Sequence, residues 1–200
     1  MSGVGRRVIL MDMNNYKIVL ASSSPSRRLL FERAGIPCEV VVSGADETIE
    51  DNLPADEIVM TLALRKNKAV RDLCPGKVII SADSLVFLDG QIMGKPDGNE
   101  GAYEMLSFLS GKTHTIFTGV NIFYNGKEKT CCEATEVTFF PLSDMDIKDY
   151  ISSGEPIGKA GSYGIEGKGI LLIEKINGDY SNIVGLPLSR TMREISSLVI

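Results

Sequence analysis

The sequence lacks long apolar runs, although 44% of its 200 residues are hydrophobic. A membrane-spanning helix needs roughly 18 or more consecutive apolar residues, so no membrane partner is expected. The N-terminal apolar stretch, residues 8–11, is interrupted by Asp12 and is shorter than the roughly 7–15 residues of a signal-peptide core. We therefore expect a cytoplasmic protein that folds as one soluble domain.

Cysteine and histidine are also scarce. The four cysteines, Cys38, Cys74, Cys131 and Cys132, show neither C-x-x-C spacing nor the density of a secreted disulfide scaffold. We therefore expect reduced thiols and no zinc site. His114 is the only histidine, so a Ser-His-Asp triad or a multi-histidine metal site would depend on one residue near a predicted hairpin base. A structural role for His114 is favoured over a catalytic one.

Positive charge is in deficit, with 21 Lys and Arg residues against 26 Asp and Glu and a net charge of −5. Nonspecific affinity for nucleic acids comes mainly from clustered Lys and Arg, so this balance argues against a duplex-binding protein. No nucleic-acid partner is expected, whereas a small anionic substrate remains compatible with the composition.

The hydrophobic pattern predicts a mixed α/β domain over residues 17–200, preceded by an N-terminal extension, residues 1–16. The predicted strands cover residues 18–21, 38–43, 77–81, 115–124, 127–140 and 170–173. The predicted helices begin at Ser24-Pro25, cover residues 56–73 and about 99–109, run from Ser143 to near Gly154, and begin again at Pro187. Asn125-Gly126 and Asp89-Gly90 predict two-residue hairpin turns. Residues 157–168 and 177–185 are expected to form loops.

Acidic side chains follow two of the predicted strands. Asp83 comes directly after an apolar run, which predicts a position at the carboxyl end of a central strand, where α/β proteins commonly bind ligands. Asp46 and Glu47 form a second acidic pair after a valine-rich strand. A turn or capping role remains an alternative for Asp83, and a solvated turn remains one for the acidic pair.

Four cations occupy unusual positions. Lys66 falls on the apolar face of its predicted helix, with snorkelling to solvent as the alternative. Arg27 lies in the first turn of a helix, where its guanidinium and the free N–H groups could bind an oxyanion. Lys95 and Lys159 lie in glycine-containing loops. Such cations together with two or three carboxylates suit a polyphosphate and a divalent metal.

Eight segments, taken in order, resemble the Maf-like family of nucleoside triphosphate pyrophosphatases, from residue 18 to about residue 195. The segments are LASSSPSRRLL (20–30), DET (46–48), LALRKNKA (62–69), SADSLV (81–86), GKP (94–96), LSGKTHTIFTGV (109–120), EPIGKAGSYGIEG (155–167) and INGDYSNIVGLPL (176–188).

The resemblance implies a two-lobed α/β fold related to the inosine-triphosphate pyrophosphatase fold, with the nucleotide in a cleft between the lobes. Water would attack the α phosphorus of a nucleoside triphosphate and release the monophosphate and pyrophosphate. A divalent metal cation, Mg, Mn or Co, would be required, and a homodimer is the expected assembly.

The resemblance also implies roles for individual residues. Asp83, Glu47, Lys66 and Lys95 would form the catalytic group, with Glu47 and Asp83 holding the metal and orienting or deprotonating water. The substrate-binding residues would be Ser22, Arg27, Ser84, Lys159 and Glu166. Among these, Ser22 and Arg27 would bind phosphate, Lys159 would line the triphosphate path with Lys66 and Lys95, and Glu166 would face the base or metal end of the cleft.

Four positions depart from the family members that act on dTTP and UTP, which usually read S-P-R-R, A-D-T, D-K-A-G and G-I-Q-G. This chain has Ser26, Ser84, Gly158 and Glu166 at the differing positions. Glu166 matches relatives that prefer 7-methyl-GTP, whereas Ser26 and Ser84 match neither group. Residues 159–165 agree with the dTTP/UTP branch, so we favour these substrates. A 7-methyl-GTP pyrophosphatase and a nucleotide-binding regulator of septum formation with little catalysis are the alternatives.

Overall fold

The computed structural model describes residues 16–48 and 53–199, which are organised around one seven-stranded sheet. The strands are β1 (Ile18–Leu20), β2 (Glu39–Val40), β3 (Val78–Leu88), β4 (Gln91–Met93), β5 (Thr113–Tyr124), β6 (Lys127–Phe139) and β7 (Ile173–Asn177). Their order is β2-β1-β3-β5-β6-β7, and β4 pairs with the end of β3. The β2-β1-β3 pairs are parallel and the remaining pairs are antiparallel.

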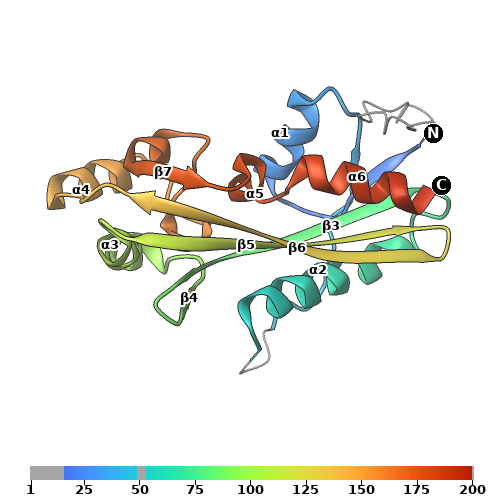
Figure 1. Ribbon diagram of the computed structural model, residues 1–200, viewed down its shortest axis with the longest axis horizontal. Coiled ribbons are helices and arrows are strands. Elements are labelled where there is room, and N and C mark those ends of the chain that lie inside the picture. Colours follow the sequence, from blue (N-terminus) through green and yellow to red (C-terminus); the bar gives the residue numbers. More distant parts are fainter. Residues whose placement is uncertain (1–15, 49–52, 200) are drawn as a thin grey trace, which may run out of the picture.

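Helices cover both faces of the sheet (Figure 1). They are α1 (Pro25–Arg33), α2 (Ala55–Arg71), α3 (Gly98–Leu109), α4 (Asp144–Ser152), α5 (Tyr180–Val184) and α6 (Leu188–Val199), with short 3₁₀ helices η2 (Ala160–Ser162) and η3 (Lys168–Leu172). Helix α2 lies on one side of the long strands, and α1, α5 and α6 lie on the other. The predicted mixed α/β fold is confirmed. No helix within the described residues has the length and apolar character to cross a membrane.

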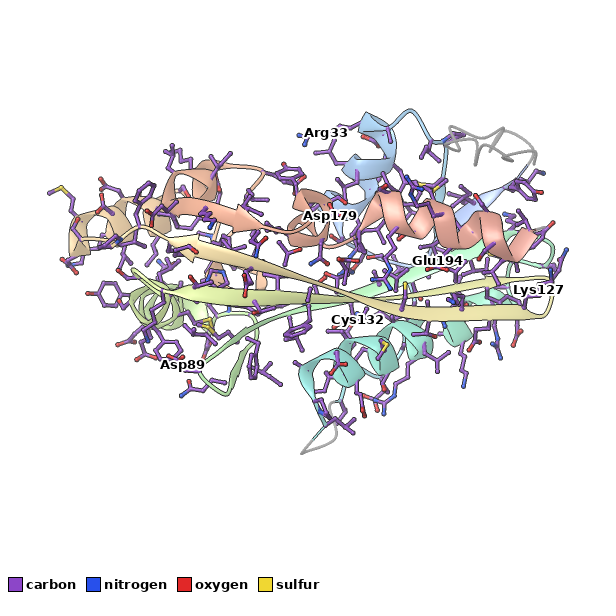
Figure 2. All side chains as sticks on the ribbon, in the orientation of Figure 1. Arg33, Asp89, Lys127, Cys132, Asp179 and Glu194 are labelled. Carbon is purple, nitrogen blue, oxygen red and sulfur yellow. The ribbon has the colours of Figure 1, made fainter. Side chains whose placement is uncertain are left out.

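Two hydrophobic cores occupy opposite ends of the long strands. The first packs α1, α5 and α6 against the start of β3 and the end of β5, with Phe31, Ile80 and Ile195 at its centre. The second packs α3 and α4 against the other ends of the same strands, around Leu106 and Phe139. These cores form the two predicted lobes. Figure 2 labels Lys127 at the first-core end of the long strands and Asp89 in the β3–β4 turn on the side of the second core. A cleft between the lobes stays a prediction.

Several local signals fold as the sequence predicts. The Ser24 side chain caps α1 by accepting a hydrogen bond from the Arg27 amide, and Pro25 opens the helix. Asn125 and Gly126 both have positive φ, 47° and 81°, as a two-residue hairpin turn requires. Ser143 and Asp146 form the predicted capping box at the start of α4.

The predicted position of Asp83 at the end of a strand is wrong. Strand β3 does not end at Ser81 but continues to Leu88, so Asp83 lies in its middle. The small polar residues at 81–84 suggest a turn, yet each pairs with a residue of β5, and buried Leu85 and Val86 follow them. Cross-strand pairing therefore determines the local structure here, because strand preference depends strongly on neighbours.

The C-terminal third departs from the prediction in two places. Residues 170–173 do not form a buried strand: they belong mostly to η3, with Ile170 and Leu171 exposed, and the strand β7 begins at Ile173. Residues 177–185 are not only a loop, because they contain α5, capped by Asp179. The spacing of hydrophobic residues alone cannot distinguish a strand from a short helix in an apolar run of four or five residues.

Two further expectations concern the N-terminal region. The predicted strand at 38–43 reduces to the two residues of β2, which lie at an exposed edge of the sheet. Of the predicted N-terminal extension, residues 1–15 lie outside the described residues, and Tyr16 packs edge-to-face against Tyr124 with ring centres 5.8 Å apart.

Candidate active site

Most of the predicted site residues surround a stretch of β3 that lacks a strand partner along one edge. On that edge β3 pairs with β1 through residue 80 and with β4 from residue 86, and no described strand pairs with the residues between. The Ile80 carbonyl accepts from the Ala21 amide, so by strand alternation the main-chain groups of Ala82 and Ser84 point toward the same open edge. A ligand at this edge could contact both faces of the sheet.

On the α2 face, one ammonium group bridges two carboxylates. The Lys66 Nζ lies 2.5 Å from Asp83 Oδ1 and 3.0 Å from Glu47 Oε1. Lys66 is only 8% exposed, whereas the Glu47 side chain is 57% exposed. The snorkelling alternative for Lys66 is therefore wrong, because its charged end is held inside by carboxylates. The structure brings together three of the four predicted catalytic residues.

Close packing of α2 sets the depth of Lys66. Gly119 on β5 pairs with Asp83, and a Cβ at Gly119 would overlap main-chain atoms of Val59 and Met60 in α2. Lys66 lies seven residues after Val59, two turns along the same helix face. The glycine thus allows the helix backbone to rest directly on the sheet, which brings the Lys66 side chain to the level of Asp83.

On the opposite face, Arg27 of α1 is buried among neutral groups. Its Nε donates to the Gly185 carbonyl at 2.7 Å, and its terminal nitrogens donate to Ser22 Oγ at 3.3 Å and Ser84 Oγ at 3.0 Å. Arg27 is 9% exposed and forms no ion pair with a described carboxylate. A buried charge without a partner is unfavourable, so this guanidinium is suited to bind an anionic ligand.

The charges of the two faces influence one another. Burial lowers the pKa of the Arg27 guanidinium, while the negative charges of Asp83 and Glu47 act in the opposite direction. The two carboxylates therefore favour the charged form of Arg27 although they belong to the Lys66 cluster. The anion-binding group and the acidic group form one electrostatic site.

The structure does not join Lys95, Lys159 or Glu166 to this centre by a hydrogen bond or ion pair among the described residues. Lys95 is exposed directly after β4, and the Lys159 ammonium donates to the Glu155 carbonyl at 2.7 Å. Among the described residues, no hydrogen bond or ion pair joins either lysine to Lys66 or Arg27. Glu166 approaches Arg33 of α1 at 4.0 Å, and its Oε1 is buried without a hydrogen-bond partner.

His114 belongs to the second core. Its Nε2 lies 2.7 Å from the Tyr163 hydroxyl, and its ring packs edge-to-face against Phe139 and Tyr163. Burial lowers the pKa of His114 to about 4, so the ring is neutral near pH 7. The contacts agree with the structural role favoured from the sequence.

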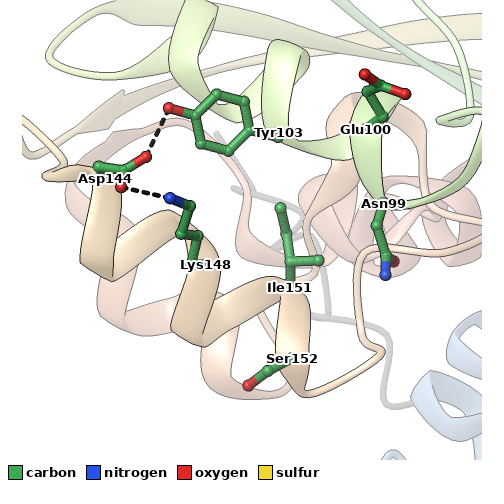
Figure 3. A pocket seen from close by; sticks show the side chains of 7 residues that line it. All are labelled: Asn99, Glu100, Tyr103, Asp144, Lys148, Ile151 and Ser152. Atoms are coloured by element: carbon green, nitrogen blue, oxygen red, sulfur yellow. Dashed lines mark hydrogen bonds and ion pairs between the residues drawn. The ribbon is translucent and has the colours of Figure 1, made fainter.

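A surface groove of about 610 Å³ lies between α3 and α4, lined by Asn99, Glu100, Tyr103, Asp144, Lys148, Ile151 and Ser152 (Figure 3). Asp144 accepts hydrogen bonds from the Tyr103 hydroxyl and the Lys148 ammonium, each at 2.7 Å. Three of the polar groups that line this groove thus bond to one another. None of the predicted site residues lines it.

Sequence reasoning missed two residues that hold Arg27 in place, Thr118 and Gly185. Thr118 lies opposite Ser84 in the β3–β5 register, and the Gly185 carbonyl ends α5 next to the guanidinium. Both occur inside the motif segments, which is the only signal that could have marked them. Their proximity to Arg27 depends on strand register and helix packing rather than on local sequence.

Glu47 and Asp83 are the residues that could hold a divalent metal. Magnesium is commonly bound by one or two carboxylates together with substrate phosphates and water, so this donor set fits an ion shared with a nucleotide. A cage built by the protein alone is not found in the described part of the chain, where no group of three or more metal-ligating side chains gathers.

The chain is similar to known proteins over most of its length. Residues 17–198 match the family model described as Maf-like protein. A dTTP/UTP pyrophosphatase of Bacillus cereus is 48% identical over 182 residues, covering 91% of this chain and 90% of that protein. A dTTP/UTP pyrophosphatase of Bacillus anthracis is 48% identical, covering 90% of this chain and 94% of that protein.

Two solved structures are similar to part of this chain. The Ham1 protein of Staphylococcus aureus has a TM-score of 0.43 and 16% identity, covering 62% of this chain and 71% of that chain. A Vibrio cholerae protein has a TM-score of 0.38 and 15% identity, covering 70% of this chain and 78% of that chain.

Proposed function

Because the chain belongs to the Maf family, we propose that it is a nucleoside triphosphate pyrophosphatase that hydrolyses dTTP and UTP. The substrate is supported by the Bacillus relatives, which are dTTP/UTP pyrophosphatases. The observation that carries the chemistry is the buried Arg27 guanidinium, which lacks a carboxylate partner among the described residues and lies at the same strand edge as Lys66 and Asp83.

In this proposal, the residues around Arg27 bind the phosphate chain. The guanidinium has five N–H donors, of which three contact protein oxygens, so two remain for phosphate oxygens. Ser22 Oγ accepts from the Ser24 amide and from Arg27, so its own hydrogen is free to donate to the ligand. Lys95 and Lys159 are proposed to contact the phosphates that leave as pyrophosphate.

The Lys66 cluster would perform the hydrolysis. Asp83 is proposed to accept a proton from the attacking water, and Glu47 to orient that water. Lys66 fixes both carboxylates through its two contacts and adds positive charge where the phosphoryl oxygens become more negative. A divalent cation bound by Glu47, Asp83 and the substrate phosphates would neutralise part of that charge.

A 7-methyl-GTP pyrophosphatase is the second candidate, and Glu166 favours it. The buried Oε1 of Glu166 has no hydrogen-bond partner, so it could accept a hydrogen bond from a donor on a purine base. A cytoplasmic location stays a prediction from the sequence features described above. A homodimer and a septum-formation role with little catalysis stay predictions from the family resemblance. Light scattering coupled to size-exclusion chromatography tests the dimer.

The direct test is hydrolysis of dTTP, UTP, CTP, GTP and 7-methyl-GTP with magnesium, manganese or cobalt, with pyrophosphate and orthophosphate assayed separately. We expect pyrophosphate from dTTP and UTP, and loss of turnover when the metal is chelated. Pyrophosphate from 7-methyl-GTP alone would replace the substrate by the second candidate. Orthophosphate as the first product, or nucleotide binding without turnover, would overturn the pyrophosphatase proposal.

A further inference from the structure

A series of hydrogen bonds connects Arg27 of α1 to the main chain of α5 through the hydroxyl groups of Ser84 and Thr118. Thr118 is completely buried on β5, and its Oγ1 lies 2.8 Å from Ser84 Oγ. The same Oγ1 donates to the Asn182 carbonyl of α5 at 3.2 Å. Ser84 Oγ in turn accepts from Arg27 at 3.0 Å. Four residues from two helices and two strands far apart in sequence are thus connected in series.

The number of hydrogens on each group determines which group donates at each step of this series of hydrogen bonds. A hydroxyl carries one hydrogen and a carbonyl can only accept, so the Thr118 hydrogen used for the Asn182 carbonyl cannot also serve Ser84. The hydrogen between the two hydroxyls must then come from Ser84, and Ser84 Oγ can only accept from Arg27. The order is Arg27 to Ser84 to Thr118 to the Asn182 carbonyl.

The reverse orientation gives the Ser84 hydrogen a poorer acceptor. If Thr118 donated to Ser84, the Ser84 hydrogen would be directed at the Gly185 carbonyl, which is 3.5 Å away and already accepts from Arg27. That contact is longer than the 3.2 Å contact to Asn182, so the first orientation is favoured. In the favoured orientation the Ser84 hydrogen is used within the protein, for Thr118.

We propose that Thr118 is a positioning residue for the Arg27 guanidinium, and that Ser84 holds Arg27 rather than donating to the ligand. Thr118 fixes the rotamer of Ser84, and Ser84 is one of three oxygen anchors that orient the guanidinium. The two N–H groups left for an anion depend on that orientation. The inference deepens the proposed function, since it concerns how the same site binds the phosphates of its nucleotide.

Thr118→Val is the main test, because valine keeps the shape of threonine and removes the hydroxyl. A hydrogen-bonded contact to a charged group contributes enough that we expect KM for dTTP to rise about tenfold, with a small change in kcat. Thr118→Ser restores the hydroxyl and should restore KM. Thr191→Val is the matched control: Thr191 is also completely buried and donates to a main-chain carbonyl, that of Pro187, but in α6 and without contact to Arg27.

Ser84→Ala keeps the test decisive if Thr118→Val does not fold. It breaks the chain at the next oxygen, so it should raise KM to a similar extent, and the double variant should add little beyond either single variant. An unchanged KM in folded Thr118→Val or in Ser84→Ala overturns the inference. An equal rise in Thr191→Val would also overturn it, because any lost buried hydroxyl would then have the same effect.

A nuclear magnetic resonance measurement separates this inference from the proposed function. The Nε–H signal of Arg27, assigned by its disappearance in Arg27→Lys, should exchange slowly with water in the wild type because Arg27 is buried and donates to Gly185. We expect faster exchange in Thr118→Val and no change in Thr191→Val. If the wild type hydrolysed no nucleotide, the proposed function would fail while this signal still decided the role of Thr118; equal exchange in all three proteins would refute that role.

Discussion

Asp83 and Ser84 are neighbours on β3, yet they belong to two different kinds of site. Successive strand residues point to opposite faces, so Asp83 faces α2 while Ser84 faces α1 and α5. Their partners on β5 alternate in the same way: Gly119 lies opposite Asp83, and Thr118 lies opposite Ser84. One cross-strand pair therefore serves a charged cluster, and the next serves a network of neutral hydrogen bonds.

The difference between the faces lies in how charge is balanced. On the α2 face, two carboxylates share one ammonium, so the cluster carries an excess of negative charge. On the α1 face, the Arg27 guanidinium is held by hydroxyl and carbonyl oxygens and carries unpaired positive charge. A divalent cation would complement the charge of the α2 face, and a polyphosphate would complement that of the α1 face. The comparison teaches that adjacent residues of one strand can support a charged cluster on one face of a sheet and a hydrogen-bonded guanidinium on the other.

Removing the Asp83 charge should produce the largest effect and separate the faces most clearly. We expect Asp83→Asn to lower kcat by about 10²–10⁴-fold, because a proton acceptor is lost. Nucleotide binding should persist, because the Arg27 face is unchanged. Steady-state kinetics and calorimetric binding to a nonhydrolysable nucleotide measure the two properties.

Asp89→Asn is the control for that comparison. Asp89 lies in the exposed β3–β4 turn with φ of 51°, a conformation that asparagine also adopts. Its kinetics should match the wild type. If Asp83→Asn kept full turnover, Asp83 would not be the proton acceptor.

Acid should lower the stability of the whole sheet, and so affect both faces together, because the sheet carries the buried base His114. Burial lowers the pKa of His114 from 6.5 to about 4. The unfolded chain therefore binds a proton first, and the stability contributed by the neutral ring is complete above pH 6.5 and is lost as pH falls toward about 4. The full loss is about 3 kcal/mol.

Chemical denaturation at several pH values measures this loss. We expect His114→Gln to depend less on pH between 6.5 and 4 than the wild type does. Identical slopes for the two proteins would show that other groups control acid stability. Comparisons of the two faces by mutation are cleanest above pH 6.5, where His114 is neutral.

A methyl group at position 119 should disturb the α2 face and spare the Arg27 face. The added Cβ of Gly119→Ala would overlap α2 main-chain atoms, so the helix must move away from the sheet and carry Lys66 with it. We expect a loss of about 1–3 kcal/mol in the free energy of unfolding, together with a lower kcat. Pyrophosphate binding at Arg27 should change less than kcat.

Gly101→Ala offers the same substitution where space exists. A Cβ there makes only ordinary contacts, the nearest at 3.7 Å, and Gly101 lies inside α3. Alanine is favoured over glycine in helices, so this variant should be as stable as the wild type or more stable. Equal stability of Gly119→Ala and the wild type would contradict the close packing of α2.

Neutralising Glu47 should have the smallest effect on stability. Its side chain is 57% exposed, and exposed ion pairs contribute about 0–1 kcal/mol. We expect Glu47→Gln to leave the free energy of unfolding within about 1 kcal/mol of the wild type while lowering kcat. Glu39→Gln is matched, because Glu39 is 56% exposed and pairs with Lys77 away from the site. If Glu47→Gln and Glu39→Gln had equal kcat, Glu47 would take no part in catalysis and its ion pair with Lys66 would be only structural.

Local patterns predicted the parts of the site that depend on one element. Helical periodicity placed Lys66 on the buried face of α2, and the Ser24-Pro25 signal placed Arg27 in the first turn of α1. Both positions follow from short-range geometry. The hairpin at Asn125-Gly126 was predicted for the same reason, since its turn requires residues that tolerate positive φ.

The remaining parts depend on contacts between distant segments. The register that places Thr118 beside Ser84 joins residues 34 positions apart, and the Gly185 carbonyl reaches Arg27 across 158 positions. No local pattern encodes either pairing. Asp83 was assigned to a strand end for the same reason, because the pairing with β5 that extends β3 is not visible in residues 77–88 alone.

The continuity of β3 has a consequence for how the molecule melts. The strand contributes Val78 and Ile80 to the first core and Val86 and Leu88 to the second without interruption. Neither core can lose its packing without breaking a ladder that supports the other, so we expect a single cooperative unfolding transition. A ligand bound at the open edge between the two cores would then stabilise both at once. Because one continuous sheet joins the two lobes, the lobes can approach each other only if the strands themselves bend or twist.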